Sequence, residues 1–297
     1  MRSLALTVLL TFTALTPALA GPVAPGFATS QLARNDDGAT GALALGFAAN
    51  YFGTTYTNTY VSNNGYITFK TAQTAYTPLG LGAGYNGNPI IAPFFADVDT
   101  RSAASGITSY GTGTYNGRAA FGATYPAVGY YDTHEEKLNT FQVILTNRSD
   151  TGAGNFDIYF NYDSIQWETG DASSGSNGFG GTSAAAGFNA GSGNASGTFF
   201  EFPGSRVPGS FLDTGPLALA HTTNDGVTGQ FLFNVRNGSV TVPPTTTVPE
   251  PATLALLGAG LVGLIGLRRR KVQHLRHMQK NGARSAVLLF TRCLVPG

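Results

Sequence analysis

The residues best suited to bind a metal ion are Asp97 and Asp99, two aspartates separated by one valine. Side chains two positions apart in a strand lie on the same face, so both carboxylates can face one cation. Calcium prefers six to eight oxygen ligands, but the nearby sequence has no further acid until Asp132, and it contains no EF-hand loop. The favoured interpretation is that the pair caps the end of a strand with Arg101 as partner, and a calcium site is the alternative.

The densest group of ionisable residues in the body of the chain is Asp132-Thr133-His134-Glu135-Glu136. Glu135 and Glu136 are candidates for a catalytic acid and base, with His134 as a ligand or proton shuttle. Adjacent residues of an extended segment point to opposite sides, so these groups are not expected to converge. A solvent-exposed loop between two strands is the favoured interpretation.

Two other catalytic patterns lack the context that they need. Residues 82–87 and 258–263 match the glycine spacing of a dinucleotide-binding loop, but the first is followed by a strand-like segment rather than by a helix. The body offers only His134 and His221 as hydrolase bases, and no Gly-x-Ser-x-Gly motif occurs. The sequence therefore predicts no catalytic site and no cofactor, and the chain is expected not to be an enzyme.

Carbohydrate chemistry is the main alternative. A glycosidase needs two facing carboxylates, for which Glu135, Glu168 and Glu201 are the available glutamates. Trp167 is the only tryptophan and could stack on a sugar ring as in lectins, although a position in the core is favoured. A secreted lectin or carbohydrate-active protein thus remains an open hypothesis.

Composition and charge narrow the class of protein. Only 11% of the 297 residues are charged and 40 are glycines, which excludes a charge-rich helical bundle. Residues 21–250 have a net charge of −8, whereas residues 268–297 contain 8 basic side chains and no acidic one. An acidic body is not expected to bind nucleic acid. The only cysteine, Cys293, lies near the end of the chain, so the body has no disulfide.

The body is predicted to be mostly β. Segments rich in β-branched and aromatic residues occur at residues 58–62, 66–70, 90–96, 140–146, 155–162 and 230–235. Asn63-Asn64-Gly65 is typical of a hairpin turn, Pro93 suggests an edge or a bulge, and residues 170–198 are expected to form a long surface loop. Residues 21–239 are therefore predicted to form an antiparallel sandwich or jelly-roll-like domain with glycine-rich loops.

Both ends of the chain have the composition of export signals. Residues 1–20 combine a positive start, an apolar run and the small residues Ala18 and Ala20, which is typical of a cleavable signal peptide. Residues 240–248 are expected to form an extended Pro/Thr linker. The apolar residues 252–267 would form a helix of about 24 Å, which is close to the length of a transmembrane helix when its flanking basic side chains reach outward.

The carboxyl-terminal arrangement resembles the PEP-CTERM sorting signals of Gram-negative bacteria. It consists of the motif Pro249-Glu250-Pro251, the apolar helix and a basic stop formed by Arg268, Arg269, Arg270 and Lys271. The resemblance implies that an exosortase recognises residues 249–271 and cleaves near the motif. Residues 272–297 depart from the pattern, because such signals normally end close to the basic stop.

The body resembles nidogen-like (NIDO) domains over about residues 45–237. The similarity is carried by Val61-Ser62-Asn63-Asn64-Gly65-Tyr66-Ile67, Ile91-Ala92-Pro93-Phe94-Phe95-Ala96-Asp97-Val98-Asp99, Ile165-Gln166-Trp167-Glu168 and later segments in the same order. The family occurs in extracellular matrix and cell-surface proteins and implies a role in adhesion without established catalytic residues.

Three functional hypotheses follow from the sequence. The first is an exported, non-enzymatic surface or matrix protein that acts in adhesion or in a biofilm. Its expected partners are exosortase and the export machinery during processing, and a polysaccharide or a surface protein afterwards. The second is the carbohydrate-binding or carbohydrate-active protein described above. The third keeps the helix at residues 252–267 as a permanent inner-membrane anchor of a periplasmic protein.

Overall fold

The computed structural model describes residues 22–243 and 246–247. The signal-peptide residues Ala18 and Ala20, the motif at 249–251, the expected helix at 252–267 and the basic stop at 268–271 lie outside the described residues, as does the tail at 272–297. Among the residues that the structure describes, no helix is long and apolar enough to cross a membrane.

The described chain is built almost entirely of strands, with two short 3-10 helices. The strands are β1 (Ser30–Gln31), β2 (Leu43–Tyr51), β3 (Thr54–Ser62), β4 (Tyr66–Thr68), β5 (Ile90–Phe95), β6 (Val98–Asp99), β7 (Ser109–Tyr115), β8 (Arg118–Tyr130), β9 (His134–Asn147), β10 (Phe156–Ser164), β11 (Ala185–Asn189), β12 (Phe199–Glu201), β13 (Thr222–Thr223), β14 (Gln230–Arg236), β15 (Ser239–Thr241) and β16 (Thr246–Thr247). The helices are η1 (Asp171–Ser173) and η2 (Leu219–His221). The prediction of a mostly β domain is confirmed.

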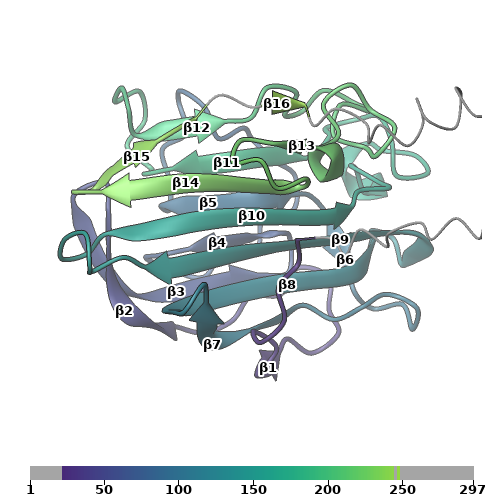
Figure 1. The fold of residues 1–297 in the computed structure, drawn as a ribbon. Coiled ribbons are helices and arrows are strands. Elements are labelled where there is room, and N and C mark those ends of the chain that lie inside the picture. Colours follow the sequence, from purple (N-terminus) through teal and green to yellow (C-terminus); the bar gives the residue numbers. More distant parts are fainter. Residues whose placement is uncertain (1–21, 244–245, 248–297) are drawn as a thin grey trace, which may run out of the picture. The chain divides into compact units, whose positions relative to one another are not determined.

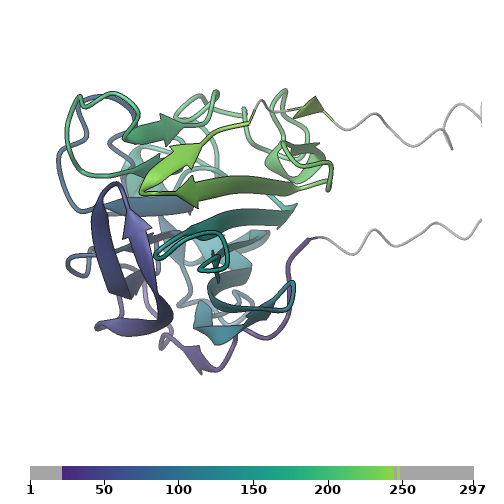
Figure 2. The same cartoon turned by 60° about the vertical axis from the view of Figure 1, so that its left-hand side comes forward.

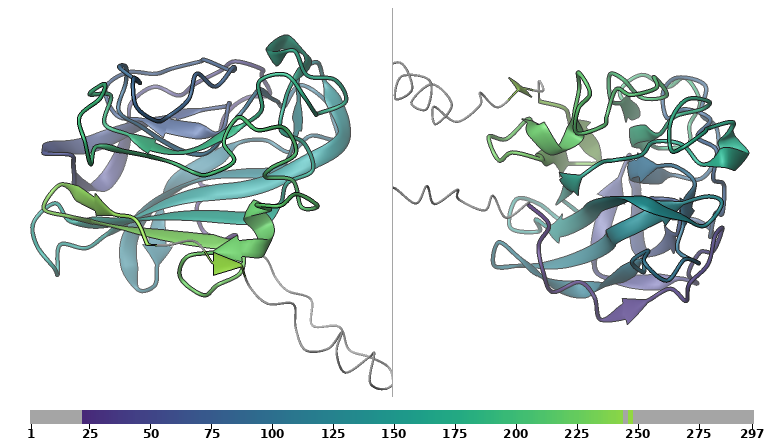
Figure 3. Two further views of the ribbon diagram at one scale, coloured as in Figure 1. Left: turned by 90° about the horizontal axis from the view of Figure 1, so that it is seen from above. Right: turned by 90° about the vertical axis from the view of Figure 1, so that its right-hand side faces the viewer.

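Two antiparallel sheets form the layers of a sandwich (Figure 1). The eight-stranded sheet has the order β1-β7-β8-β9-β10-β14-β15, with β6 also paired to β8. The six-stranded sheet has the order β12-β11-β5-β4-β3-β2, and β13 and β16 form a separate pair. The views in Figures 2 and 3 show β2–β5 and β11 in one layer and β8–β10 and β14 in the other.

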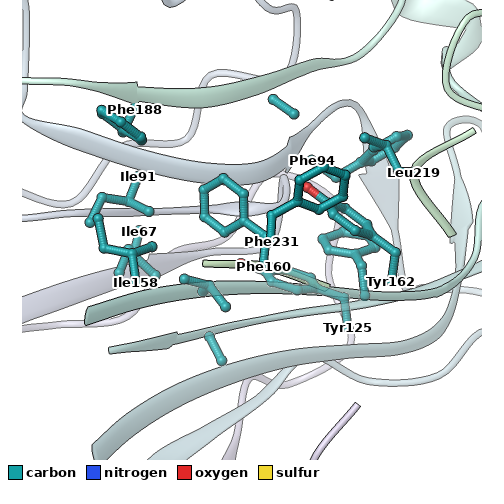
Figure 4. Close-up of a cluster of buried hydrophobic side chains, with 14 of the residues drawn as sticks. Ile67, Ile91, Phe94, Tyr125, Ile158, Phe160, Tyr162, Phe188, Leu219 and Phe231 are labelled. Atoms are coloured by element: carbon teal, nitrogen blue, oxygen red, sulfur yellow. The ribbon is translucent and has the colours of Figure 1, made fainter. Parts of the chain in front are cut away.

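Aromatic and aliphatic side chains from both sheets fill the space between the layers (Figure 4). Phe94 of β5 packs against Phe141 of β9, with 5.2 Å between ring centroids, and against Trp167 at 5.7 Å. Trp167 is fully buried, and its indole N–H donates a hydrogen bond to the Val128 carbonyl oxygen. Trp167 is therefore a core residue and not an exposed sugar-stacking platform.

The hairpin predicted around Asn63-Asn64-Gly65 is confirmed, because β3 pairs with β4 and Ser62 lies opposite Tyr66. Gly65 has a φ of +79°, which the turn requires. Pro93 lies at a bulge, since the register of β5 and β11 shifts between its neighbours. It does not lie on an edge strand, because β5 is central in its sheet.

Two segments differ from their predicted structure. The surface loop expected at residues 170–198 contains η1 and the fully buried strand β11, which lies between β5 and β12. The alanine-rich sequence of β11 has low strand propensity, and tertiary pairing overrides it. In the predicted linker at residues 240–248, the described residues include the end of β15 and all of β16, which are paired strands rather than free linker.

The segment that precedes β1 covers the outer face of the eight-stranded sheet (Figure 1). Phe27 is buried there with Ile144 and Tyr159, and the backbone N–H of Ala24 donates a hydrogen bond to the side-chain oxygen of Gln142 at 3.0 Å. The alternation of β10 predicted a half-buried strand, but β10 is buried on both faces over most of its length, and its Tyr159 packs in the cluster with Phe27.

Candidate metal centre

Three carboxylates gather at the end of the sandwich where the turn between β8 and β9 lies (right side of Figure 1). Asp36 and Asp37 lie in the segment between β1 and β2, and Asp97 lies between β5 and β6. Each offers one carboxylate oxygen, and these three oxygens lie within 4.8 Å of one another. Segments 60 residues apart in sequence thus form one all-oxygen donor set.

The segment that carries Asp36 and Asp37 is fixed by buried asparagine side chains of the β3–β4 turn. The Asn63 amide donates to the carbonyl oxygens of Asp36 and Val98, both at 2.7 Å. The Asn64 amide donates to Asp37 Oδ1 at 2.9 Å. Both asparagines are fully buried, so the turn acts as a support for the acidic segment rather than as an exposed loop.

Asp97 is the buried member of the cluster, with an exposed fraction of 2%. Within the described residues, Asp97 Oδ2 and Asp36 Oδ1 are buried without a hydrogen-bond partner. Both residues line a cavity of about 160 Å³ together with Asp37, Tyr76, Tyr131 and Ala172. Gly170 packs closely against Asp97, because a Cβ at that position would lie 2.5 Å from Asp97 Oδ2.

The electrostatic environment of the cluster opposes its full ionisation. Burial, together with the neighbouring charges of Asp36, Asp37 and Asp99, raises the pKa of Asp97 to about 7. Burial and the charge of Asp37 likewise raise the pKa of Asp36 to about 6. Carboxylates held in this way are stabilised by a proton or by a cation.

Asp99 belongs to a different network from Asp97. It is fully buried, and Arg101 Nε lies 3.0 Å from each of its carboxylate oxygens. Burial opposes the ionisation of Asp99, but hydrogen bonds from Arg101 and from the Thr133 backbone outweigh it and lower its pKa. Arg101 is thus the partner that the sequence suggested for the Asp97-Asp99 pair, but it holds Asp99, while Asp97 faces the other two aspartates.

The ionisable group at residues 132–136 does not converge on one site. His134 Nε2 lies 3.2 Å from Asp171, and its ring stacks on Tyr130 with 4.5 Å between centroids. Glu136 contacts His134 and the Tyr130 hydroxyl, whereas Glu135 contacts the Ser102 hydroxyl and the Ala104 backbone. The expectation that Glu135 and Glu136 diverge is confirmed, although residues 134–136 begin strand β9 instead of lying in a loop.

The two remaining glutamates also have separate partners. Glu168 is buried and accepts hydrogen bonds from the backbone N–H groups of Gly209 and Phe211. Glu201 lies in an open pocket of about 690 Å³, where Arg206 is 3.4 Å away. The same pocket is lined by residues 82–87, the glycine pattern that resembled a nucleotide loop, and these residues lead into strand β5 rather than into a helix.

Of the three clustered aspartates, only Asp97 was predicted from the sequence, as one of the Asp97-Asp99 pair. Asp36 and Asp37 were missed, because the next acid that was considered as a ligand was Asp132, further along the chain. The run Asn35-Asp36-Asp37-Gly38 was the available signal, because two adjacent acids in a turn-forming stretch are themselves candidate ligands. The buried role of Asn63 and Asn64 had no signal that distinguishes it from an ordinary turn.

Two packed antiparallel sheets with glycine-rich connections define an all-β sandwich module. The chain belongs to the nidogen-like domain family, whose model matches residues 57–115 and 102–237. The resemblance inferred from the sequence over about residues 45–237 is confirmed. A second model, the PEP-CTERM protein-sorting motif, matches residues 247–271 and confirms the resemblance at that end of the chain.

Alpha-tectorins from three species are among the curated relatives. The chain is 33% identical to alpha-tectorin of Mus musculus over 222 residues, or 67% of this chain, and 32% identical to that of Homo sapiens over the same length. Alpha-tectorin of Gallus gallus is 31% identical over 245 residues, or 75% of this chain. In each case the match covers 10% of the relative, so the chain spans about a tenth of their length. No solved structure gives a significant match.

Proposed function

We propose that this chain is a non-enzymatic protein of the cell surface or extracellular matrix, and that its nidogen-like domain acts in adhesion or in association with biofilm exopolysaccharide. The single observation that supports this most is the presence of a nidogen-like domain and a PEP-CTERM sorting motif in one chain. This combination indicates an exported protein that an exosortase processes. The adhesive role is the further step that we propose.

In the proposed route, the signal peptide at residues 1–20 directs export and is cleaved after Ala20. The helix at 252–267 then holds the precursor in the membrane, with the basic stop at 268–271 in the cytoplasm. Exosortase acts near residues 249–251 and passes the domain to the surface or the medium. The tail at 272–297 leaves with the sorting signal.

Exposed apolar side chains offer a surface for an extracellular partner. Leu79 is 82% exposed, Val207 55% and Phe179 50%. Their loops are neighbours, since the guanidinium of Arg206 lies against Gly80 and the ring of Phe179 lies against Gly209. Apolar residues on adjacent loops of an otherwise polar surface are typical of an interaction site.

The sorting step is tested by replacing Pro249, Glu250 and Pro251 with alanine and fractionating the cells. We expect the variant to stay in the inner membrane, while the wild-type domain reaches the surface or medium. Replacing Pro243 and Pro244 with alanine is the matched control, because it changes two nearby prolines outside the motif. Identical distribution of wild type and variant would contradict exosortase processing.

Mass spectrometry of the mature carboxyl terminus separates this proposal from a permanent anchor. A terminus near residue 251 is expected, whereas an intact helix at 252–267 would show a membrane-tethered periplasmic protein. Adhesion itself is tested by comparing surface attachment and matrix retention in a deletion strain with and without the gene. Attachment that does not change on deletion would contradict the adhesive role.

Carbohydrate binding is the second candidate function, and the pocket at Glu201 favours it. Its volume of about 690 Å³ lies within the range of small-molecule sites. Its lining combines the aromatic ring of Tyr85 with the polar groups of Asn86, Glu201 and Arg206. A glycan array should show binding that Tyr85→Ala abolishes, and an array without signal would remove this candidate.

A further inference from the structure

The cluster of Asp36, Asp37 and Asp97 contains more negative charge than the surrounding protein neutralises. The nearest cation that the structure gives it is Arg101, which lies 3.5 Å from Asp36 Oδ2. Arg101 also pairs with Asp99 at 2.5 Å and with Asp132 at 3.0 Å, so it is shared among three carboxylates. Asp97 and Asp37 have no ion pair among the described residues.

A second observation is that two buried carboxylate oxygens of the cluster lack a hydrogen-bond partner among the described residues. Asp97 is 98% buried, yet its Oδ2 atom accepts no hydrogen bond within residues 22–243. Asp36 Oδ1 is also buried and accepts no hydrogen bond from these residues. Buried carboxylate oxygens are almost always paired, and both of these residues line the same cavity. The unsatisfied oxygens therefore point to a ligand that belongs in that cavity.

We propose that Asp36, Asp37 and Asp97 bind a calcium ion in this cavity. The donors are carboxylate oxygens without histidine or cysteine, which favours a hard cation over zinc or copper. The cavity of about 160 Å³ accommodates an ion with bound water but is smaller than the roughly 300–1,000 Å³ of small-molecule sites. Three aspartates with water completing the shell suit the flexible coordination of calcium.

The bound ion would join segments that are distant in sequence. Asp36 and Asp37 precede β2, Asp97 connects β5 to β6, Tyr131 lies in the β8–β9 turn and Ala172 belongs to η1. The backbone already links two of these, since Tyr131 N–H donates to the Asp97 carbonyl oxygen at 3.2 Å. Calcium would therefore stabilise this end of the sandwich and make the thermal stability of the domain calcium-dependent. This inference does not depend on the adhesive role.

The first test compares thermal unfolding of the full-length chain in detergent, after removal of metals with a chelator and with added calcium or magnesium. We expect the unfolding temperature of the wild type to rise with calcium concentration, and to rise less with magnesium. Asp97→Asn should abolish the response while raising the unfolding temperature of the metal-free protein, because it relieves repulsion from Asp36 and Asp37. Asp163→Asn, an exposed aspartate, makes the same charge change and should leave the response intact.

The second test uses terbium, which replaces calcium and luminesces when a nearby tyrosine is excited. Tyr76 and Tyr131 both line the cavity, so terbium bound there should show sensitised emission that calcium displaces. Asp37→Asn should lower the emission several-fold, which provides a second variant if Asp97→Asn does not fold. Absence of a calcium-specific shift, an equal shift with magnesium, or terbium emission unchanged in both variants would each overturn the proposal.

Discussion

Replacing Asn63 by alanine should destabilise the protein far more than is usual for a turn asparagine. The side chain is fully buried, and its amide donates to the carbonyl oxygens of Asp36 and Val98 at 2.7 Å. Its oxygen accepts a hydrogen bond from Thr108 Oγ1 at 3.0 Å. Alanine removes these three hydrogen bonds and a longer one of 3.3 Å from the same amide to the Asn35 carbonyl oxygen, and it leaves their partners without this side chain.

The magnitude follows from the number of buried groups that lose a partner. Each such loss costs about 1–3 kcal/mol, so losing the three shorter hydrogen bonds, partly relieved when water reaches their partners, should lower the unfolding free energy by about 3–6 kcal/mol. A domain is stable by roughly 5–15 kcal/mol in total. Asn63→Ala should therefore remove a large part of the stability of the fold.

Urea unfolding followed by fluorescence measures this effect, because Trp167 is the only tryptophan and is fully buried. Asn58→Ala is the matched control, since Asn58 is exposed on the adjoining strand β3, and it should change stability by less than about 0.5 kcal/mol. Asn63→Asp keeps the size of the side chain but places a carboxylate against two carbonyl oxygens, so it should destabilise more than alanine.

Two outcomes would refute this reasoning. The first is an Asn63→Ala protein whose unfolding midpoint matches that of Asn58→Ala. The second is an Asn63→Asp protein that is more stable than Asn63→Ala, because hydrogen-bond donation by Asn63 would then not be what holds the Asp36 segment.

Three further predictions concern other parts of the fold. Gly65→Ala should destabilise the domain severely, because a Cβ would lie 1.7 Å from the Phe94 carbonyl oxygen. Gly53 also has a positive φ of +85°, but a Cβ there would meet nothing within 4 Å. Gly53→Ala should therefore cost only about 1–2 kcal/mol of unfolding free energy, and thermal melting compares the two variants. Burial raises the pKa of Glu168 above its ordinary value of 4.5, so the folded state holds the proton more tightly, and the stability from this group is lost as pH rises through the folded pKa. Urea titrations at several pH values should show a larger fall in the wild type than in Glu168→Gln, in which Asp36 and Asp97, with pKa values raised to about 6 and about 7, still titrate. Tyr125→Phe removes a 2.7 Å hydrogen bond to the last carbonyl of β3 and should lower the unfolding free energy by about 1–2 kcal/mol.

Each of these has a clear contrary result. Equal melting temperatures for the two glycine variants would show that the close approach at Gly65 is easily relieved. Parallel pH profiles for the wild type and Glu168→Gln would show that Glu168 titrates as it does in the unfolded chain. Unchanged stability of Tyr125→Phe would mean that water replaces the tyrosine hydroxyl.

Strands with regular alternation and clear turns could be predicted from the sequence. The hairpin of β3 and β4 follows from β-branched residues on both sides of Asn63-Asn64-Gly65, and β10 follows from its alternating aromatic residues. Strand β8 was missed although it has 13 residues. Its alternation is broken by small residues and by the register shift between Tyr125 and Val128, where Ala127 has a φ of +47°.

Small residues hid strand β11 for a related reason. Alanine and glycine carry little strand propensity, but they are needed where neighbouring backbones approach closely. A Cβ on Gly187 would lie 2.1 Å from the Phe200 carbonyl oxygen. The small residues of β11 are explained by how closely the neighbouring strands approach it, and a single sequence does not reveal that distance.

The acidic cluster shows the same limit for a site. Asp97 was recognisable as a candidate ligand because Asp99 follows it two residues later at a strand end. That spacing suggested Asp99 as the second ligand, but Asp99 pairs with Arg101 instead. The true neighbours, Asp36 and Asp37, come from a segment 60 residues earlier. Asn63 and Asn64 position that segment, so the three aspartates come together only when the β3–β4 turn packs against the segment before β2.

The covering of the outer sheet face by residues 22–29 has a consequence for export. A secreted chain emerges from its amino terminus first, yet Ala24 finds its hydrogen-bond partner at Gln142, 118 residues later. On the export route proposed above, the leading segment would reach its place in the fold only after most of the domain had crossed the membrane, and Phe27 would be uncovered until then. A chaperone that shields short apolar stretches would act on this chain mainly during that interval.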